Sequence, residues 1–137
     1  MNDRTRTVAY WATTVVIAAE LAVGGVWDIL RIPYVREVLE QRLRYPAYFS
    51  VIIGVWKVPG AAALLVPGVP RLKDWAYAGA VFTYTGAAAS HLAVGDGAGA
   101  VGPIGFAAIA LVSWALRPPA RRDLAPRSGP SSWVPAR

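Results

Sequence analysis

Residues 45–67, YPAYFSVIIGVWKVPGAAALLVP, decide how this chain folds. As a helix, this almost wholly apolar stretch is long enough to cross the roughly 30 Å hydrocarbon core of a bilayer. Lys57 stands near its middle. A charged side chain at bilayer depth costs about 2.5–3.5 kcal/mol on insertion scales, so we expect Lys57 to face other helices or a wet cavity and to have a partner there.

The composition of the whole chain agrees with this interpretation. Of its 137 residues, 55% are hydrophobic and only 16% are charged, a more apolar balance than soluble domains have. Four apolar segments follow one another, at residues 7–26, 46–66, 74–94 and 100–116. We therefore predict an all-α integral membrane protein, a four-transmembrane-helix bundle over residues 1–117, followed by a basic, Pro/Arg-rich cytoplasmic tail at 118–137 that is expected to be disordered.

The longest connection joins the first and second apolar segments, and its sequence is WDILRIPYVREVLEQRLR at residues 27–44. Pro33 suits a helix start, and apolar residues then recur at helical spacing opposite charged ones. This pattern predicts a short amphipathic interfacial helix. It is either a connector that seals one end of the bundle or a lid over a cavity.

The distribution of basic residues predicts the orientation in the membrane. Nine Lys and Arg residues lie in the N-terminus, the second connection and the tail, against four in the first and third connections. The positive-inside rule then places both termini in the cytoplasm of a multi-pass protein in a cell membrane, of the bacterial inner-membrane type. Because the formal charge of +6 collects beside hydrophobic segments, it indicates contact with a lipid bilayer and no nucleic acid.

Several polar residues fall at similar depths in the predicted helices. Glu20, Gly24 and Asp28 share one face of the first helix. The small residues Gly54 and Ala61 turn Lys57 inward, so Glu20 and Lys57 are expected to form an ion pair at the floor of an outward-facing pocket.

Residues of the third helix complete this predicted site. Tyr77, Tyr84 and His91 recur every seven residues along one side of that helix, and His91 is expected near the pocket mouth together with Asp28. The predicted catalytic residues are Glu20, Lys57 and His91, and the predicted ligand-binding residues are Asp28, Thr83, Tyr84 and Trp56. The alternative is that Glu20 and Lys57 only neutralise each other and fix the helix register.

The cysteine and histidine counts limit the cofactors. The chain has no cysteine and one histidine, so no metal site and no iron–sulfur cluster is implied, and thiol redox chemistry is excluded. Any redox role then requires a bound quinone or a partner subunit.

A series of motifs in residues 43–96 resembles the DoxX-like family of four-helix integral membrane proteins. The motifs are Tyr45-Pro46, Gly54-x-x-Lys57-x-x-Gly60, Leu64-Leu65-x-Pro67, Lys73-x-Trp75-Ala76-Tyr77-Ala78-Gly79 and Gly86-Ala87-x-x-Ser90-His91. The resemblance implies a place in membrane redox complexes, such as the membrane subunit of a thiosulfate:quinone oxidoreductase, although other relatives are assembly factors without catalysis.

Three functions remain open from the sequence. The first is a membrane oxidoreductase, or the quinone-facing subunit of a redox complex, that binds a small lipophilic ligand and associates with a redox partner or with its own copies. The second is an acid–base enzyme of the isomerase type that acts on a lipophilic small molecule, with Lys57 as base and Glu20 or His91 as acid. The third is a non-catalytic assembly or interaction subunit.

Overall fold

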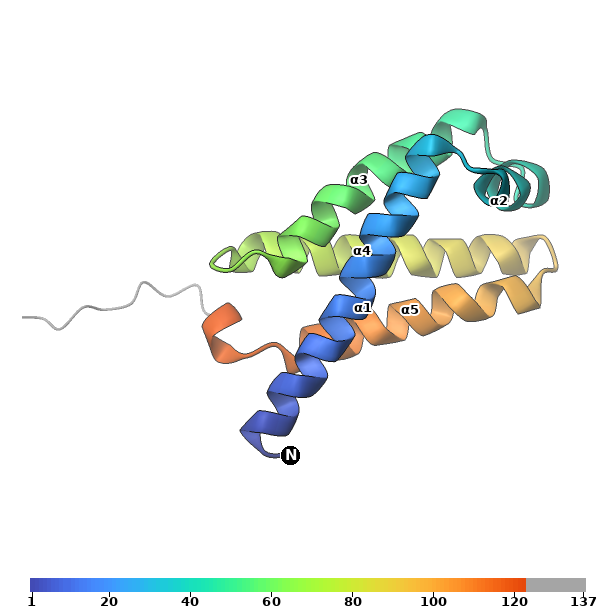
Figure 1. The fold of residues 1–137 in the computed structure, drawn as a ribbon. Helices are drawn as coiled ribbons and strands as arrows, with labels where there is room; N and C mark the ends of the chain where they lie inside the picture. The colour runs from blue at the N-terminus through green and yellow to red at the C-terminus, as the bar shows by residue number, and fades with distance from the viewer. Residues whose placement is uncertain (123–137) are drawn as a thin grey trace, which may run out of the picture.

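The computed structural model describes residues 1–122, and every regular element in that part of the chain is a helix. Figure 1 shows four long helices. They are α1 (Asp3–Leu30), α3 (Ala47–Leu65), α4 (Pro70–Ala93) and α5 (Gly97–Leu116). The all-α prediction is therefore confirmed.

Two short segments complete the described fold. The first is α2 (Pro33–Val35), which continues directly into the π-helix η1 (Arg36–Arg42), and the second is the 3₁₀ helix η2 (Pro119–Arg121). Most of the predicted tail, residues 123–137, lies outside the described residues. The start of the tail, up to residue 122, is described and packs on the bundle, since the Arg121 guanidinium lies 4.5 Å from the ring centre of Trp11.

Three of the four long helices, α1, α3 and α5, are long and apolar enough to cross a membrane. The fourth, α4, has 24 residues but a lower mean hydropathy because Gly, Ser, Thr, Tyr and His take the place of large aliphatic residues. Large apolar side chains lie on the exterior of the bundle, as with Trp56 and Trp75, which are 74% and 75% exposed. Such an apolar exterior is suited to contact with a lipid bilayer.

The long helices form two pairs. α1 packs mainly against α3 and α4 mainly against α5, while α1 also crosses α5. In Figure 1 the two pairs diverge toward the end of the molecule that carries α2 and η1. A core that includes Ile17, Leu64 and Tyr84 holds them together away from that end.

The α1–α3 contact depends on glycine. A Cβ atom on Gly54 would lie 2.9 Å from the backbone nitrogen of Ile29 and closer still to the carbonyl oxygen of Gly25, so the two backbones touch. Ala61 and Leu64, further along the same stripe of α3, are buried. The expected close approach through small residues is thus present.

The connection between α1 and α3 is helical from Pro33, as the sequence predicts, but most of it is a π-helix instead of an α-helix. α1 ends at Leu30, and the next residue, Arg31, caps it in a left-handed conformation with φ of 50°. Its guanidinium forms an ion pair of 2.7 Å with Glu40 of η1 and so ties the connection back to the end of α1.

α4 begins at Pro70, four residues before the predicted apolar segment at 74–94, so Lys73 lies in its first turn. Its side chain is fully buried and its ammonium group donates hydrogen bonds to the last carbonyls of α3, at 2.7 Å to Ala63 and 3.0 Å to Leu64, and also to Val66. Carbonyls at a helix C-terminus have no partner within the helix, so Lys73 supplies it.

The glycine contact generates a prediction. Gly54→Ala should lower the stability of the protein by about 1–3 kcal/mol, because the added methyl group overlaps the α1 backbone, which cannot move aside as a side chain could. Gly105→Ala on α5 is the control, since a Cβ atom there meets nothing within 4 Å. Thermal unfolding of both variants in detergent tests this, and equal melting temperatures for the two would contradict the described α1–α3 contact.

Candidate functional site

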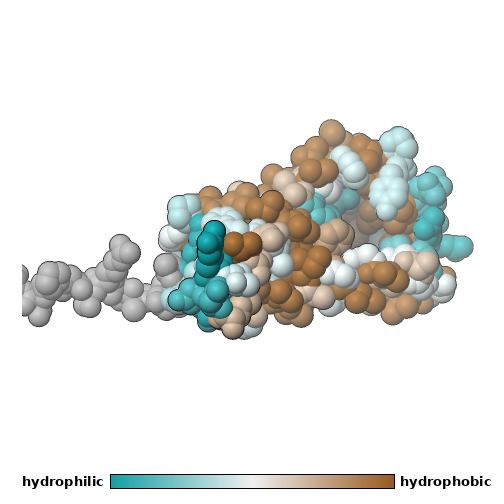
Figure 2. Space-filling view, turned by 60° about the horizontal axis from the view of Figure 1, so that its bottom comes forward, coloured by the Kyte–Doolittle hydropathy of each residue, from teal (hydrophilic) through white to brown (hydrophobic). Residues whose placement is uncertain are grey.

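A cavity of about 780 Å³ lies between the α1–α3 pair and the α4–α5 pair, on the side where they diverge and where η1 crosses the gap. In the space-filling view of Figure 2, hydrophilic surface lies inside this recess, hydrophobic surface lies above and below it, and further hydrophilic surface lies at its right end. Aromatic side chains supply much of the lining, among them Trp27, Phe49, Phe82 and Phe106. The cavity thus combines apolar walls with a polar interior.

Lys57 is bound to two carboxylates in this cavity. Its Nζ atom lies 3.0 Å from Glu20 Oε1 and 3.2 Å from Asp28 Oδ2, and the hydroxyl of Tyr84 donates a hydrogen bond to Glu20 Oε2. The three charged side chains are only 11–22% exposed. With every group ionised the cluster would carry a formal charge of −1, because one ammonium faces two carboxylates.

Local sequence explains why these groups meet. Glu20 and Asp28 are eight residues apart and share one face of α1. Between them Gly24 leaves the room that the ammonium needs, since a Cβ atom there would lie 2.8 Å from both Glu20 Oε1 and Lys57 Nζ.

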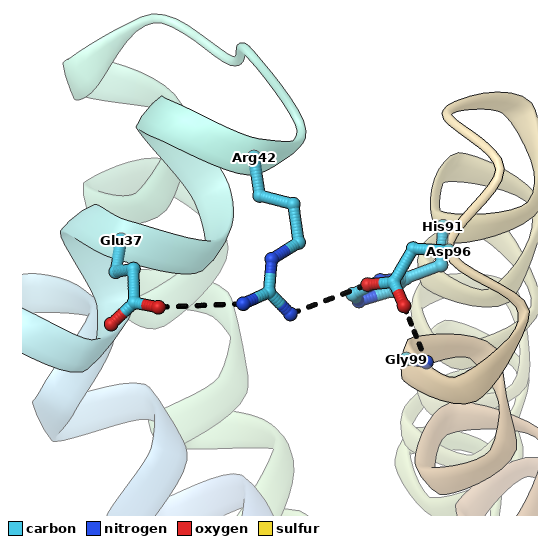
Figure 3. Close-up of polar contacts among 5 residues, drawn as sticks. All are labelled: Glu37, Arg42, His91, Asp96 and Gly99. Atoms are coloured by element: carbon cyan, nitrogen blue, oxygen red, sulfur yellow. Dashed lines mark hydrogen bonds and ion pairs between the residues drawn. The ribbon is translucent and has the colours of Figure 1, made fainter.

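A second polar cluster, drawn in Figure 3, lies where η1 faces the turn between α4 and α5, and four of its five residues line the cavity. Asp96 accepts a hydrogen bond of 2.9 Å from the backbone amide of Gly99 and lies 2.9 Å from His91 Nδ1. Arg42 of η1 reaches Asp96 Oδ2 at 3.3 Å and Glu37 at the same distance. The connection between α1 and α3 is therefore joined electrostatically to the turn between α4 and α5.

The same contacts set the proton affinity of Asp96. The Gly99 amide, then the hydrogen bond with His91 and then Arg42 lower the pKa of the Asp96 carboxyl below its ordinary value of 3.8. Asp96 also caps the N-terminus of α5, which begins at Gly97 and so includes glycines that precede the predicted start at residue 100.

The structure brings most of the predicted site residues into the cavity and separates two of them from the main cluster. Hydrogen bonds link Lys57 to Glu20 and Asp28, and Glu20 to Tyr84, and Thr83 also lines the cavity. His91 lines the cavity too, but its partner is Asp96 and not Asp28 or Glu20. The roles of the predicted site residues in binding or catalysis stay predictions.

Trp56 lies elsewhere. It lines a smaller groove of about 300 Å³ between α3 and α4, together with Trp75 and Gly79. Three residues, Ile53, Lys57 and Thr83, line both this groove and the larger cavity.

Arg42 and Asp96 were missed as site residues. Arg42 lies in the predicted connection at 27–44 and contributes there only to the count of basic residues, and Asp96 lies between the predicted segments 74–94 and 100–116. A signal for Asp96 was present, because an acidic residue directly before the first turn of a helix is a common N-cap. Nothing in the sequence pairs it with Arg42, which is 54 residues away.

Comparison with known proteins identifies the family of this chain. The sequence model of the DoxX-like family matches residues 12–113, a range that contains both polar clusters and all four long helices in whole or in large part. No curated protein and no solved structure shows a significant match to the chain.

The lowered pKa of Asp96 predicts a specific pH dependence. A carboxyl whose folded-state pKa lies below its unfolded value stabilises the fold above that unfolded value, and the contribution is lost as the pH falls through the folded pKa. Wild type should therefore melt at a higher temperature than Asp96→Asn at pH 6–7, with the difference shrinking below about pH 4.

Melting curves in detergent between pH 2.5 and 7 make this measurement. Glu37→Gln is the matched control, because it removes the other carboxylate on Arg42 and leaves the bonds from Gly99 and His91 to Asp96 intact. A difference between wild type and Asp96→Asn that is independent of pH would show that Asp96 is not the titrating group.

Proposed function

The chain belongs to the DoxX-like family of membrane proteins, and from this premise we propose that it binds a small lipophilic ligand in the cavity beside Lys57. In this proposal the protein is a membrane oxidoreductase or the quinone-facing membrane subunit of a redox complex. The cavity opens to the outer side of a cell membrane of the bacterial inner-membrane type, and both termini are cytoplasmic.

The observation that carries the proposal is the position of Lys57, Glu20 and Asp28 in one cavity. Ionisable groups inside a membrane are expensive and usually mark a substrate or proton site. A purely structural ion pair would need one carboxylate for one ammonium. Here a second carboxylate and a tyrosine hydroxyl are added, in a hollow large enough for a ligand.

A quinone fits the shape and chemistry of this site. The cavity volume falls within the range of about 300–1,000 Å³ that is usual for small-molecule sites, and its aromatic and aliphatic walls suit a flat ring. When bound, a quinone supplies reversible uptake of two electrons and two protons. Since the chain has no cysteine, the electrons would come from a partner redox subunit.

Each polar residue then has a distinct task. Lys57 would donate a hydrogen bond to a ring carbonyl, while Glu20 or Asp28 would hold or release the proton. Tyr84 orients Glu20 through its hydroxyl. His91, held by Asp96 nearer the mouth, would exchange protons with the outer solution.

The proposal is tested on the full chain purified in mild detergent, by mass spectrometry and absorbance of the extracted ligand. We expect a quinone in wild type and its loss in both Glu20→Gln and Lys57→Met. A non-redox lipophile would favour the acid–base enzyme instead, and an empty protein with stoichiometric partners would favour an assembly subunit.

The same variants have unequal predicted stabilities. Lys57→Met should cost about 3–5 kcal/mol, because it leaves two carboxylates without their cation, whereas Glu20→Gln should cost less since Asp28 still neutralises Lys57. The double variant should recover part of the loss and adding Asp28→Asn should recover more, yet ligand binding should stay absent.

The half-buried pair of Arg31 and Glu40, at the end of α1, is the control for this double-mutant cycle. It lies outside the cavity lining, so its variants should keep the ligand, whereas the variants of Glu20 and Lys57 should lose it. A coupling of zero between Glu20 and Lys57, or ligand binding that returns with stability, would refute the proposed site.

That α4 spans the membrane as the fourth helix is part of this proposal and gives a further prediction. Single cysteines can be placed cleanly because the chain has none. Gln41→Cys and Gly97→Cys should react with an impermeant thiol reagent from outside intact cells, and Arg4→Cys and Arg71→Cys only after permeabilisation. Reaction of positions 71 and 97 from the same side would mean that α4 does not cross.

A further inference from the structure

The groove between α3 and α4 has the form of a channel for a hydrocarbon chain. On α4 its lining runs from Leu72 to Thr83, which is about 16 Å along the helix, and on α3 from Ile53 to Ala63 over a similar length. Apart from Lys57 and Thr83, all of its lining residues are apolar. The groove is therefore elongated, and polar only at one end.

Small residues create this hollow. A Cβ atom on Gly79 would meet nothing within 4 Å, and one on Gly60 would meet only Leu21, at 4.0 Å. Trp56 and Trp75 flank the groove on the exterior and are 74% and 75% exposed. Since this exterior is the apolar surface of the helices, the groove opens toward the lipid.

The polar end of the groove adjoins the floor of the cavity. Lys57 lines both hollows, whereas its carboxylate partners Glu20 and Asp28 line the cavity alone. The ammonium group thus belongs to the cavity, and the aliphatic part of Lys57 stands with Ile53 and Thr83 between the two spaces. These three side chains line the junction between the cavity and the apolar groove that lies directly beyond it.

We propose that the ligand carries a long alkyl or isoprenoid chain, with its polar ring in the cavity at Lys57 and its chain passing Ile53 and Thr83 into the α3–α4 groove. This inference rests on the proposed function for the ring and adds the class of the ligand. It also makes Gly60 and Gly79 residues that determine specificity for the chain without touching the ring. Because the groove opens toward the lipid, such a ligand can reach Lys57 directly from the bilayer. It does not need to pass between Arg42 and Asp96, which bridge the other entrance to the cavity.

The test compares two probes, a benzoquinone with a decyl chain and the same ring without it, by quenching of tryptophan fluorescence in detergent-solubilised full-length protein. Gly79→Leu fills the groove and leaves every tryptophan in place. It should lower the affinity for the chain-bearing probe about tenfold, the size expected when one or two methylene groups of the probe lose an apolar site. Binding of the chainless probe should change by less than about twofold.

Gly105→Leu on α5 is the matched control, since it adds the same side chain at another open position that lines neither hollow. It should leave the binding of both probes unchanged. Partition of the decyl probe into the detergent would affect both variants equally, so a difference between them cannot come from the detergent. Circular dichroism and melting temperature check that both variants are folded, and Gly60→Leu repeats the test from the α3 side.

The outcomes separate this inference from the proposed function. If both probes depend on Glu20 and Lys57 but Gly79→Leu affects them equally or not at all, the chain site is overturned and the quinone function stands. If no quinone binds, yet a co-purified chain-bearing lipophile is lost from Gly79→Leu and kept in Gly105→Leu, the chain site stands without the redox function. A compact co-purified ligand, or none at all, overturns the chain site.

Discussion

The neutralisation of Lys57 is the constraint on which the rest of the structure depends. An ammonium group in the middle of an apolar helix is tolerable only when carboxylates reach it, and this requires α1 and α3 to lie in contact at one register. The glycines of that contact make the register possible, because Gly25 and Gly54 bring the backbones together and Gly24 leaves space for the charge. The packing of α1 on α3 and the pairing of Lys57 with its carboxylates therefore depend on the same helix register.

The parts of the fold that the sequence predicted are those governed by local patterns. The four long helices follow from apolar runs, and the pairing of Glu20 with Lys57 follows from opposite charges at matching depth. The family resemblance was also correct. Asp28 was placed near the mouth with His91, whereas it in fact contacts Lys57, because Lys57 has a long side chain that reaches both carboxylates on the same face of α1.

What the sequence did not predict depends on contacts between distant segments. Arg42 and Asp96 meet only because η1 crosses the gap between the helix pairs, and no periodicity records that crossing. The π-helical form of η1 was not foreseen either, since its residues have the spacing of an ordinary amphipathic α-helix. The polar character of α4 follows from its composition, but whether it crosses the bilayer is not decided by composition.

The buried position of Lys73 has a consequence for how the chain enters the membrane. Its ammonium group donates hydrogen bonds to the terminal carbonyls of the preceding helix. The last carbonyls of α3 and the charged side chain at the start of α4 are therefore paired with each other within one helical hairpin. Neither group needs water once the turn has formed. In the proposed topology, in which α4 also crosses the membrane, the two helices would leave the translocation machinery as a pair, and the less hydrophobic α4 would enter the lipid together with its apolar neighbour.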